Sequence, residues 1–512
     1  MPRCLRCLTM KPRATFLFLI SVFSLLLAGA LYFPENGILL GNNLRLQFIS
    51  KKDLFSVTGT GYANINPLLK HQQYLSDSVL TALTQSNETG LKVRGASTDS
   101  LLKSITRIEY PNNDSTVLYP FFESLMNVQQ TGNLIRIMHY GDSQIEDDRI
   151  TSLLRNKLQT RFGGSGAGLV PVAQPYPYAF SMRQSNSANW KRFAGFGRRD
   201  TTIKHRRYGS LASYCSYRPS GNPSMPDTVG AWVRFRSAST SYANTRSFYQ
   251  CRVFYSQNKE PFLHEIYQDG KRVDAEIFPS AKRLKVIHWD LDRPAKDLML
   301  TFKGKSSPEI YGVALDGQSG VAVDNIPMRG CSGLFFTSLD EQLMRDMYRE
   351  LNVKLFILQF GGNFVPAGLP NFDGYERWFE KQLRLIRKVC PDAAILVMGV
   401  ADMSEKDKTK YVTNPNVVKV RDALRTAAFR NGAAFWDTYE AMGGQNSMPS
   451  WVFADPPLAS EDFVHFNIRG ARTIGALFYN AFILDYNRYE NQVMLLRKND
   501  MNASFPTADI SF

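Results

Sequence analysis

Cysteine and histidine are scarce in this chain, with six of each among 512 residues. Cys4 and Cys7 form a C-x-x-C pair, but no second pair of ligands lies nearby, which argues against a zinc site. The glycines of residues 163–168 follow a predicted helix and lack the Gly-Lys-Ser/Thr ending of a phosphate-binding loop. We therefore expect neither a metal nor an organic cofactor.

Acidic residues are also few, since 46 Asp and Glu stand against 61 Lys and Arg and give a net charge of +15. Residues 1–13 contain four basic residues and no acid, and residues 14–33 are uncharged. This pattern is typical of an export signal. An exported basic protein suits an anionic envelope polymer, or its charge serves solubility alone; export argues against nucleic acid as a partner.

The export segment has two interpretations. Ala28-Gly29-Ala30 is an A-x-A cleavage sequence after a short apolar core, whereas the whole uncharged run is long enough to span a bilayer. We favour an uncleaved anchor with its basic end in the cytoplasm. In either case we expect an exported protein, either periplasmic and anchored in the inner membrane or secreted.

The four cysteines beyond this segment would enter an oxidising compartment. Cys215 and Cys251 fall in one β-rich region and form the most natural disulfide. The set allows three pairings, however, and four buried thiols fit the sequence equally well. The other two members are Cys331 and Cys390.

Composition and periodicity divide the chain into six segments. Residues 1–33 are the signal peptide or anchor, and residues 34–115 a spacer rich in Ser, Thr and Asn. Residues 116–174 and 318–486 carry apolar strands separated by amphipathic helices, which is typical of a parallel sheet covered on both faces. Residues 175–317 alternate apolar and polar side chains and predict an inserted antiparallel β-sandwich. Residues 487–512 form a polar tail.

Shorter patterns predict four further details within these segments. The Ser338-x-x-Glu341 capping box predicts a helix over residues 338–351, and a closing helix is expected over residues 468–484. The acids of residues 146–148 are expected in the first turn of a helix, where the helix dipole favours negative charge. Residues 181–210 combine basic and aromatic side chains, which either contact a glycan or form a solvated basic face over buried aromatics.

Ser143 lies at the end of the first apolar strand, in Gly141-Asp142-Ser143. The carboxyl end of a strand, just before a helix, is where an α/β sheet presents reactive groups to a ligand. The tripeptide is also ordinary turn chemistry. Ser143 is our candidate nucleophile, because the serines of other glycine-rich turns (Ser165, Ser319 and Ser332) complete no G-x-S-x-G motif.

His465 is the histidine best placed to act as a base. It follows Asp462 by three residues and precedes a predicted helix, so one loop can deliver both a base and its orienting acid. The alternative is a helix-entry loop with an incidental histidine. His139 lies inside a strand, where a buried structural histidine is the default, and the others fall in the spacer or the sandwich: His71, His205, His264 and His288.

Four motifs resemble those of the SGNH, or GDSL, hydrolase superfamily and occur in its order. They are Gly141-Asp142-Ser143, Asn325-Ile-Pro-Met-Arg-Gly330, Gly361-Gly362-Asn363 and Asp462-Phe-Val-His465. The resemblance implies a flavodoxin-like three-layer α/β/α fold. It implies Ser143 as nucleophile, His465 as general base and acid, and Asp462 as its orienter. The implied oxyanion hole comprises the N–H groups of Ser143 and Gly330 and the amide of Asn363.

The sequence departs from the family pattern at two positions. Gln144 stands where leucine is common, and Phe364 replaces the aspartate that often follows the asparagine. A β-sandwich inserted after the first motif also resembles the peptidoglycan O-acetylesterases. That architecture implies a serine esterase that removes O-acetyl groups from an envelope or extracellular glycan, peptidoglycan first. The alternatives are an O-acetyltransferase of the same fold and an inactive glycan-binding protein; the sequence does not indicate an oligomeric state.

Overall fold

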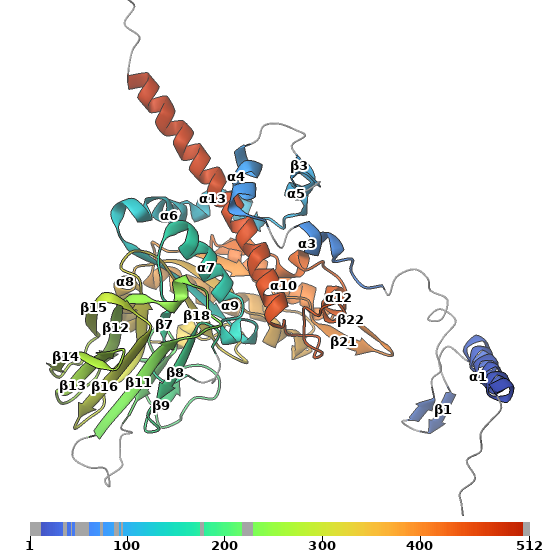
Figure 1. Ribbon diagram of the computed structural model, residues 1–512, viewed down its shortest axis with the longest axis horizontal. Helices are drawn as coiled ribbons and strands as arrows, with labels where there is room; N and C mark the ends of the chain where they lie inside the picture. The colour runs from blue at the N-terminus through green and yellow to red at the C-terminus, as the bar shows by residue number, and fades with distance from the viewer. Residues whose placement is uncertain are drawn as a thin grey trace, which may run out of the picture. The chain divides into compact units, whose positions relative to one another are not determined.

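The computed structural model describes residues 12–33, 38–41, 44–46, 61–71, 75–85, 92–93, 96–174, 179–217 and 229–504 (Figure 1). The chain divides into two units, Met1–Tyr62 and Ala63–Phe512. The first contains helix α1 (Pro12–Tyr32) and a hairpin of β1 (Ile38–Gly41) and β2 (Leu44–Leu46). Residues Pro12–Gly29 of α1 have a mean hydropathy of 1.7, so the helix is long and apolar enough to cross a membrane.

The second unit is built on a six-stranded sheet of order β18-β6-β19-β20-β23-β5. Its first five strands are parallel, and β5 pairs antiparallel at the edge. Numbered by their place in the chain, the parallel strands follow the flavodoxin order 2-1-3-4-5. The strands are β5 (Ile108–Glu109), β6 (Leu134–Gly141), β18 (Gly320–Pro327), β19 (Val353–Gln359), β20 (Ala394–Met398) and β23 (Ala434–Trp436).

Helices cover both faces of this sheet, as the apolar strands predict. Alternate β6 residues point to opposite faces, so Ile135 and Ile137 join one apolar core while Met138 and Tyr140 join the other. The first core includes helices α6 (Tyr119–Thr131), α7 (Thr151–Phe162) and α13 (Ile468–Ser504). The second includes α8 (Glu341–Glu350), α9 (Asp373–Val389) and α10 (Asn416–Arg430). The predicted three-layer α/β/α class is confirmed.

Between α7 and β18 the chain forms two antiparallel sheets, which lie to one side of the α/β domain (Figure 1). One has the order β15-β12-β17-β10-β9, with β7 (Gly168–Val170) also paired to β17, and the other has the order β14-β13-β16-β11-β8. The strands are β8 (Met182–Asn186), β9 (Lys191–Ala194), β10 (Ser213–Ser216), β11 (Val229–Ser237), β12 (Phe248–Ser256), β13 (Phe262–Gln268), β14 (Lys271–Phe278), β15 (Lys285–Ala295), β16 (Asp297–Gly304) and β17 (Glu309–Asp316).

Side chains of both sheets share one apolar core, which includes Val233 of β11 and Val253 of β12. The period-two pattern that predicted an inserted β-sandwich is therefore realised. Trp190, Phe193 and Tyr208 are buried, so the aromatics of residues 181–210 belong largely to the core rather than to a sugar-stacking surface. Cys215 and Cys251 are buried free thiols, and the proposed disulfide is wrong: the two lie on β10 and β12, which flank β17 without pairing with each other.

The segment expected to be a spacer contributes to the α/β domain. Residues Leu80, Leu101 and Ile108 are buried in the first core, and Trp436 donates from its ring nitrogen to the Thr106 carbonyl at 3.0 Å. The interpretation as a spacer of limited structure missed short apolar elements that bury their few large side chains. The described elements of this segment are α3 (Asn66–His71), α4 (Asp77–Gln85), β3 (Lys92–Val93), β4 (Ala96–Ser97), α5 (Thr98–Ser104) and β5.

Two helix boundaries also differ from expectation. α8 is capped by Asp340, which accepts from the Leu343 N–H at 2.9 Å, and Ser338 lies in a preceding 3-10 turn, so the predicted capping box is not used. α13 continues through the predicted polar tail to Ser504 because Tyr486 and Tyr489 keep its early part packed in the core. The remaining elements are η1 (Pro111–Asn113), η2 (Ser115–Leu118), η3 (Ser143–Asp148), η4 (Asn244–Arg246), η5 (Phe336–Ser338), η6 (Gly362–Ala367), β21 (Ser404–Asp407), β22 (Lys410–Thr413), α11 (Thr438–Ala441) and α12 (Ser447–Val452).

Candidate active site

Three of the four sequence motifs follow the carboxyl ends of neighbouring parallel strands. Ser143 begins η3 directly after β6, Gly330 lies three residues beyond β18, and Asn363 lies in η6 just after β19. Strands β18, β6 and β19 are adjacent and run in the same direction, so these segments share one edge of the sheet. The loop before α13 brings His465 to the same edge.

Ser143, His465 and Asp462 form a continuous hydrogen-bonded chain. Ser143 Oγ lies 2.8 Å from His465 Nε2, and His465 Nδ1 lies 2.7 Å from Asp462 Oδ2. The second oxygen, Asp462 Oδ1, accepts from the backbone N–H groups of Val464 at 2.9 Å and His465 at 3.0 Å. The acid therefore holds both the ring and the backbone of the histidine, an arrangement suited to general-base activation of the serine.

The surroundings of Asp462 favour its ionised form. Partial burial acts to raise the pKa of this carboxyl, but hydrogen bonds from the backbone and ring of His465 and from Val464 outweigh burial and lower the pKa overall. A carboxylate that stays charged fixes the orientation of the imidazole and stabilises the imidazolium formed during proton transfer.

The groups expected to hold an oxyanion lie in the loops that follow β18 and β19, at the same edge of the sheet as Ser143. Gly330 adopts a φ of 74°, a conformation that favours glycine, and Asn363 Nδ2 donates to the carbonyl of Cys331 at 3.3 Å. This hydrogen bond connects Asn363 to the loop that contains Gly330. Phe364, which departs from the family pattern, stacks on Tyr375 with ring centroids 4.1 Å apart, and this stacking braces the Asn363 turn.

Gln144, the second departure, connects the serine turn to the histidine loop. Its Nε2 donates to the Val464 carbonyl at 2.6 Å, and its Oε1 accepts from the Phe466 N–H at 3.3 Å. The two bonds flank His465 in the sequence. Leucine at this position would make neither bond, so the departure has a structural purpose that sequence reasoning missed.

Arg149 strengthens the same connection. Its Nη1 donates to the Phe466 carbonyl at 2.8 Å and its Nη2 to the Ser143 carbonyl at 2.5 Å. One guanidinium thus binds the backbone of both the nucleophile and the segment after the base. Burial lowers the pKa of Arg149, but the residue remains a cation because arginine titrates far above neutral pH.

Asp142 connects the serine turn to the Asn363 segment. Its carboxylate accepts from the Gln144 N–H at 2.9 Å and also receives a backbone hydrogen bond from Gly362. Burial raises the pKa of Asp142 to about 6, against the lowering effect of these bonds. A side chain at position 362 would start 3.3 Å from the Asp142 oxygen, so glycine permits this close approach.

The acids after Ser143 correct the helix-dipole interpretation, because all three precede α7 and two of them have specific partners. Glu146, buried, pairs with Arg329 next to Gly330, with Oε1 2.5 Å from Nη2 and Oε2 3.1 Å from Nε. Asp148, also buried, pairs with Arg155 at 2.6 Å and accepts a hydrogen bond from Ser181. Together with Asp142, Gln144 and Arg149, Glu146 ties the serine turn to each of the other three motif-bearing loops.

His139 has the structural role expected of a histidine inside a strand. Its Nε2 lies 3.1 Å from Gln359 Oε1 and its Nδ1 2.9 Å from Thr151 Oγ1. Burial lowers its pKa to about 3, so it is neutral at physiological pH. Among the residues that the structure describes, no group of three or more His, Cys, Asp or Glu is placed to hold a metal ion.

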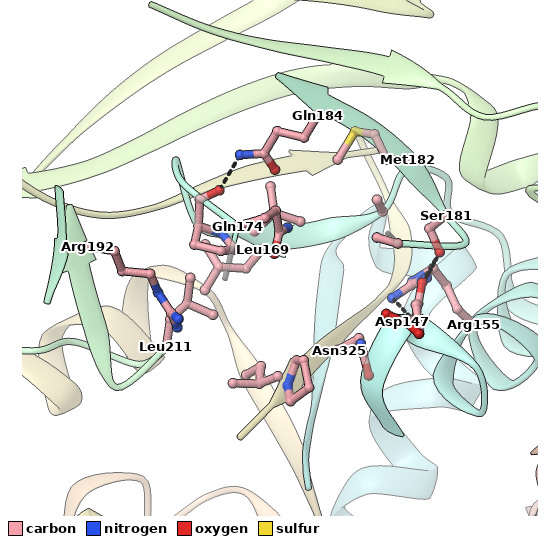
Figure 2. A pocket seen from close by; sticks show the side chains of 17 residues that line it. Asp147, Arg155, Leu169, Gln174, Ser181, Met182, Gln184, Arg192, Leu211 and Asn325 are labelled. Atoms are coloured by element: carbon pink, nitrogen blue, oxygen red, sulfur yellow. Dashed lines mark hydrogen bonds and ion pairs between the residues drawn. The ribbon is translucent and has the colours of Figure 1, made fainter. Parts of the chain in front are cut away.

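A cavity of about 60 Å³ lies where the sandwich meets the ends of η3 and β18. Figure 2 shows Leu169, Met182 and Leu211 around it, with Asn325 and Asp147 on the side of the α/β domain. The cavity is therefore lined both by the inserted domain and by the two segments that carry Ser143 and Gly330.

Comparison with known proteins agrees with this arrangement. Residues 300–473 match the model of the GDSL-like Lipase/Acylhydrolase family, a range that contains Gly330, Asn363, Asp462 and His465 and begins after Ser143. No curated protein sequence matches the chain significantly.

Among solved structures, a peptidoglycan O-acetylesterase is 20% identical to this chain in sequence. Its TM-score is 0.55, and the match covers 74% of this chain and 96% of that one. This likeness shows a shared fold. A family two carbohydrate esterase from Clostridium thermocellum in complex with cellohexaose is 10% identical, with a TM-score of 0.22, over 51% of this chain and 95% of that one. The acetyl xylan esterase AlAXEase is 15% identical, with a TM-score of 0.25, over 31% of this chain and 81% of that one.

Proposed function

The α/β domain of this chain is a serine ester hydrolase domain of the SGNH superfamily, and from that premise we propose that the protein removes O-acetyl groups from an envelope or extracellular glycan, with peptidoglycan the first candidate. The observation that carries the proposal is the hydrogen-bonded chain from Ser143 through His465 to Asp462, at the carboxyl ends of the parallel strands. The shared fold with a peptidoglycan O-acetylesterase supports the choice of substrate.

In the proposed mechanism Ser143 Oγ attacks the acetyl carbonyl carbon while His465 Nε2 takes the serine proton. The backbone N–H groups of Ser143 and Gly330 and the amide of Asn363 stabilise the tetrahedral oxyanion. His465 then protonates the departing sugar oxygen, which leaves an acetyl-serine. Water, activated by His465, attacks that ester and releases acetate. Asp462 orients the ring throughout.

The N-terminal helix supports an exported location. α1 is long and apolar enough to anchor the protein, and four basic residues precede or begin it. In this proposal the positive end stays in the cytoplasm and the esterase acts on the outer side of the membrane.

The test is acetate release from O-acetylated peptidoglycan, xylan and alginate by the full chain and by Ser143→Ala. We expect the highest rate on peptidoglycan and a loss of at least about 10³-fold in kcat for Ser143→Ala. A Ser143→Ala protein that releases acetate at the original rate would refute the serine mechanism. Transfer of acetyl to an added glycan in preference to water would identify the protein as an O-acetyltransferase instead.

A further inference from the structure

The cavity between the sandwich and the α/β domain has an apolar lining that carries several polar groups. Leu169 of β7, Met182 of β8, Leu211 and Ile326 of β18 supply the apolar surface. Gln184 enters from the sandwich, and Asn325 and Asp147 from the α/β domain (Figure 2). With a volume of about 60 Å³, the cavity has room for a small polar group together with a methyl group.

Three polar groups on the wall of this cavity have unused hydrogen-bonding capacity. Gln184 Nε2 donates to the carbonyls of Pro171 at 2.8 Å and Val172 at 2.6 Å, whereas its Oε1 is buried and has no partner among the residues that the structure describes. Asn325 Oδ1 accepts from Thr151 Oγ1 at 2.8 Å, and in the described part of the chain its Nδ2 has no acceptor.

Asp147 is the third of these groups. Its carboxylate accepts no hydrogen bond from the described residues, and partial burial, together with the charge of Glu146, raises its pKa. A buried polar atom without a partner, such as Gln184 Oε1, costs about 1–3 kcal/mol, which a ligand that supplies the missing partner would recover. The cavity thus offers one amide donor, two acceptors and an apolar lining, beside the charged side chains of Asp148, Arg155 and Arg192 on its wall.

We propose that this cavity binds the acetamido group of an N-acetylated amino sugar in the substrate. The amide carbonyl would accept from Asn325 Nδ2, the amide N–H would donate to Gln184 Oε1 or Asp147, and the methyl group would contact Leu169 and Met182. A sugar hydroxyl would satisfy at most part of this set and leave the apolar lining without a partner. The inference rests on the proposed function, because it concerns the glycan whose ester reaches Ser143.

The position of the cavity suits such a role. Asp147 follows Ser143 by four residues, so their Cα atoms lie within about 14 Å of each other. Asn325 precedes Gly330 on the strand and loop that lead to the oxyanion donors. A glycan with one acetyl ester at Ser143 can therefore place an acetamido group of the same or an adjacent unit in the cavity. Gln184 and Met182 give the inserted sandwich a direct part in substrate choice.

The experiment compares three preparations of O-acetylated peptidoglycan strands: intact, N-deacetylated by an amidase that leaves the O-acetyl esters in place, and freed of stem peptides. We expect N-deacetylation to lower kcat/KM about tenfold, the effect of losing about 1.4 kcal/mol of binding. Removal of peptides should leave kcat/KM unchanged. Dependence on the peptide but not on the N-acetyl group would show that the cavity takes a peptide amide and would overturn the proposal, as would equal rates on all three.

The matched variant is Asn325→Asp, which keeps the oxygen that accepts from Thr151 and replaces the free donor with an acceptor. We expect it to raise KM for the intact glycan and to abolish the preference for N-acetylated strands. Hydrolysis of 4-nitrophenyl acetate, which has no acetamido group, is measured in parallel, and the loss on N-acetylated strands is expressed relative to it, so that a general loss of folding or of Ser143 activity cancels. Asn499→Asp, at an exposed site near the end of α13, is the control for the same chemical change.

Two results separate failure of this inference from failure of the proposed function. If Asn325→Asp keeps the preference for N-acetylated strands, the cavity is not the acetamido site although the esterase assignment stands. If the unaltered protein releases no acetate from any of the three preparations yet hydrolyses 4-nitrophenyl acetate, the glycan esterase proposal fails, and this inference fails with it.

Discussion

Gln144 shows how one side chain can align two segments that are distant in the sequence. Its amide bonds the backbone on both sides of His465 while its own backbone follows Ser143. A displacement of about 1 Å between a nucleophile and its base can cost 100-fold in rate. The side chain touches neither reacting atom, so we regard Gln144 as a positioning residue.

We predict that Gln144→Leu lowers kcat for acetate release by 10- to 100-fold with little change in KM, because Ser143 and His465 lose their alignment while the glycan contacts remain. Steady-state kinetics on a soluble acetylated glycan measures both constants. Gln144→Glu keeps the acceptor for Phe466 N–H but cannot donate to Val464, so it should fall between leucine and the original residue. Equal rates for all three proteins would contradict the role.

His139 makes stability depend on pH. Its folded pKa of about 3 lies below the unfolded value of about 6.5, so protons bind preferentially to the unfolded chain between these values. The stabilising contribution is complete above about pH 6.5 and is lost as pH falls towards 3. Between pH 7.5 and 5.0 this single residue should account for about 2 kcal/mol of lost stability.

The measurement is urea unfolding of the original protein and His139→Gln at pH 7.5 and 5.0. The variant should be less stable at pH 7.5, because its shorter amide reaches only part of the Gln359 and Thr151 contacts, yet it should lose about 2 kcal/mol less on acidification. His264, also buried with its pKa lowered to about 4, is present in both proteins and cancels in the comparison. The same pH dependence in both would exclude His139 as the cause.

At the level of elements, the sequence predicts which strand ends carry the candidate active-site residues. It predicts less well the contacts that hold those segments together. The strand ends at Ser143, Gly330 and Asn363 follow from apolar runs that stop at glycine-rich turns, and parallel strands bring their carboxyl ends to one edge. The hydrogen bonds of Gln144 and the pairing of Glu146 with Arg329 depend on segments far apart in the chain. Local spacing carries no signal for such pairs, so the acids looked like helix-dipole residues.

Element boundaries show the same difference between local and tertiary signals. The polar composition after Asn487 predicted a peripheral tail, yet Tyr489 is buried against Tyr119 at 4.7 Å and Phe122 at 5.8 Å, and the helix continues. Further along, Met494, Leu495 and Leu496 are exposed. The part of α13 that packs on the first core therefore ends near Val493.

We predict that a chain ending at residue 493 unfolds with a stability within about 0.5 kcal/mol of the full chain, because it keeps Gln492 and Val493, whereas Met494, Leu495 and Leu496 beyond it are exposed. A chain ending at residue 484 should lose at least about 3 kcal/mol, since it lacks Tyr486, Tyr489 and the Asp485 carboxylate that pairs with Arg107. Thermal and urea unfolding of the three proteins provide the test. Equal stability of the two truncated chains would show that the burial of these tyrosines contributes little.

At the scale of the whole second unit, an ionic cluster without solvent exposure joins the sandwich to the α/β sheet. Arg136 of β6 binds Asp324 of β18 and Asp316 of β17 at 2.5 Å each, and all three side chains are fully buried. Asp316 also pairs with Arg252 of β12 at 3.2 Å, and Asp324 accepts from the Leu169 N–H at 2.8 Å. Strands from both domains thus converge on one guanidinium.

We predict that Arg136→Met lowers stability by about 3–5 kcal/mol, because two buried carboxylates lose the cation that compensates them. The triple variant Arg136→Met, Asp316→Asn, Asp324→Asn removes the charges together and should be more stable than the single variant, since asparagine oxygens can still accept from Arg252 and Leu169. Urea unfolding of both measures the difference.

Because the cavity lies between the domains that this cluster connects, the single variant should also lose more activity on glycan than on 4-nitrophenyl acetate. A triple variant no more stable than Arg136→Met, or equal losses on both substrates, would mean that the cluster does not hold the sandwich in position for catalysis.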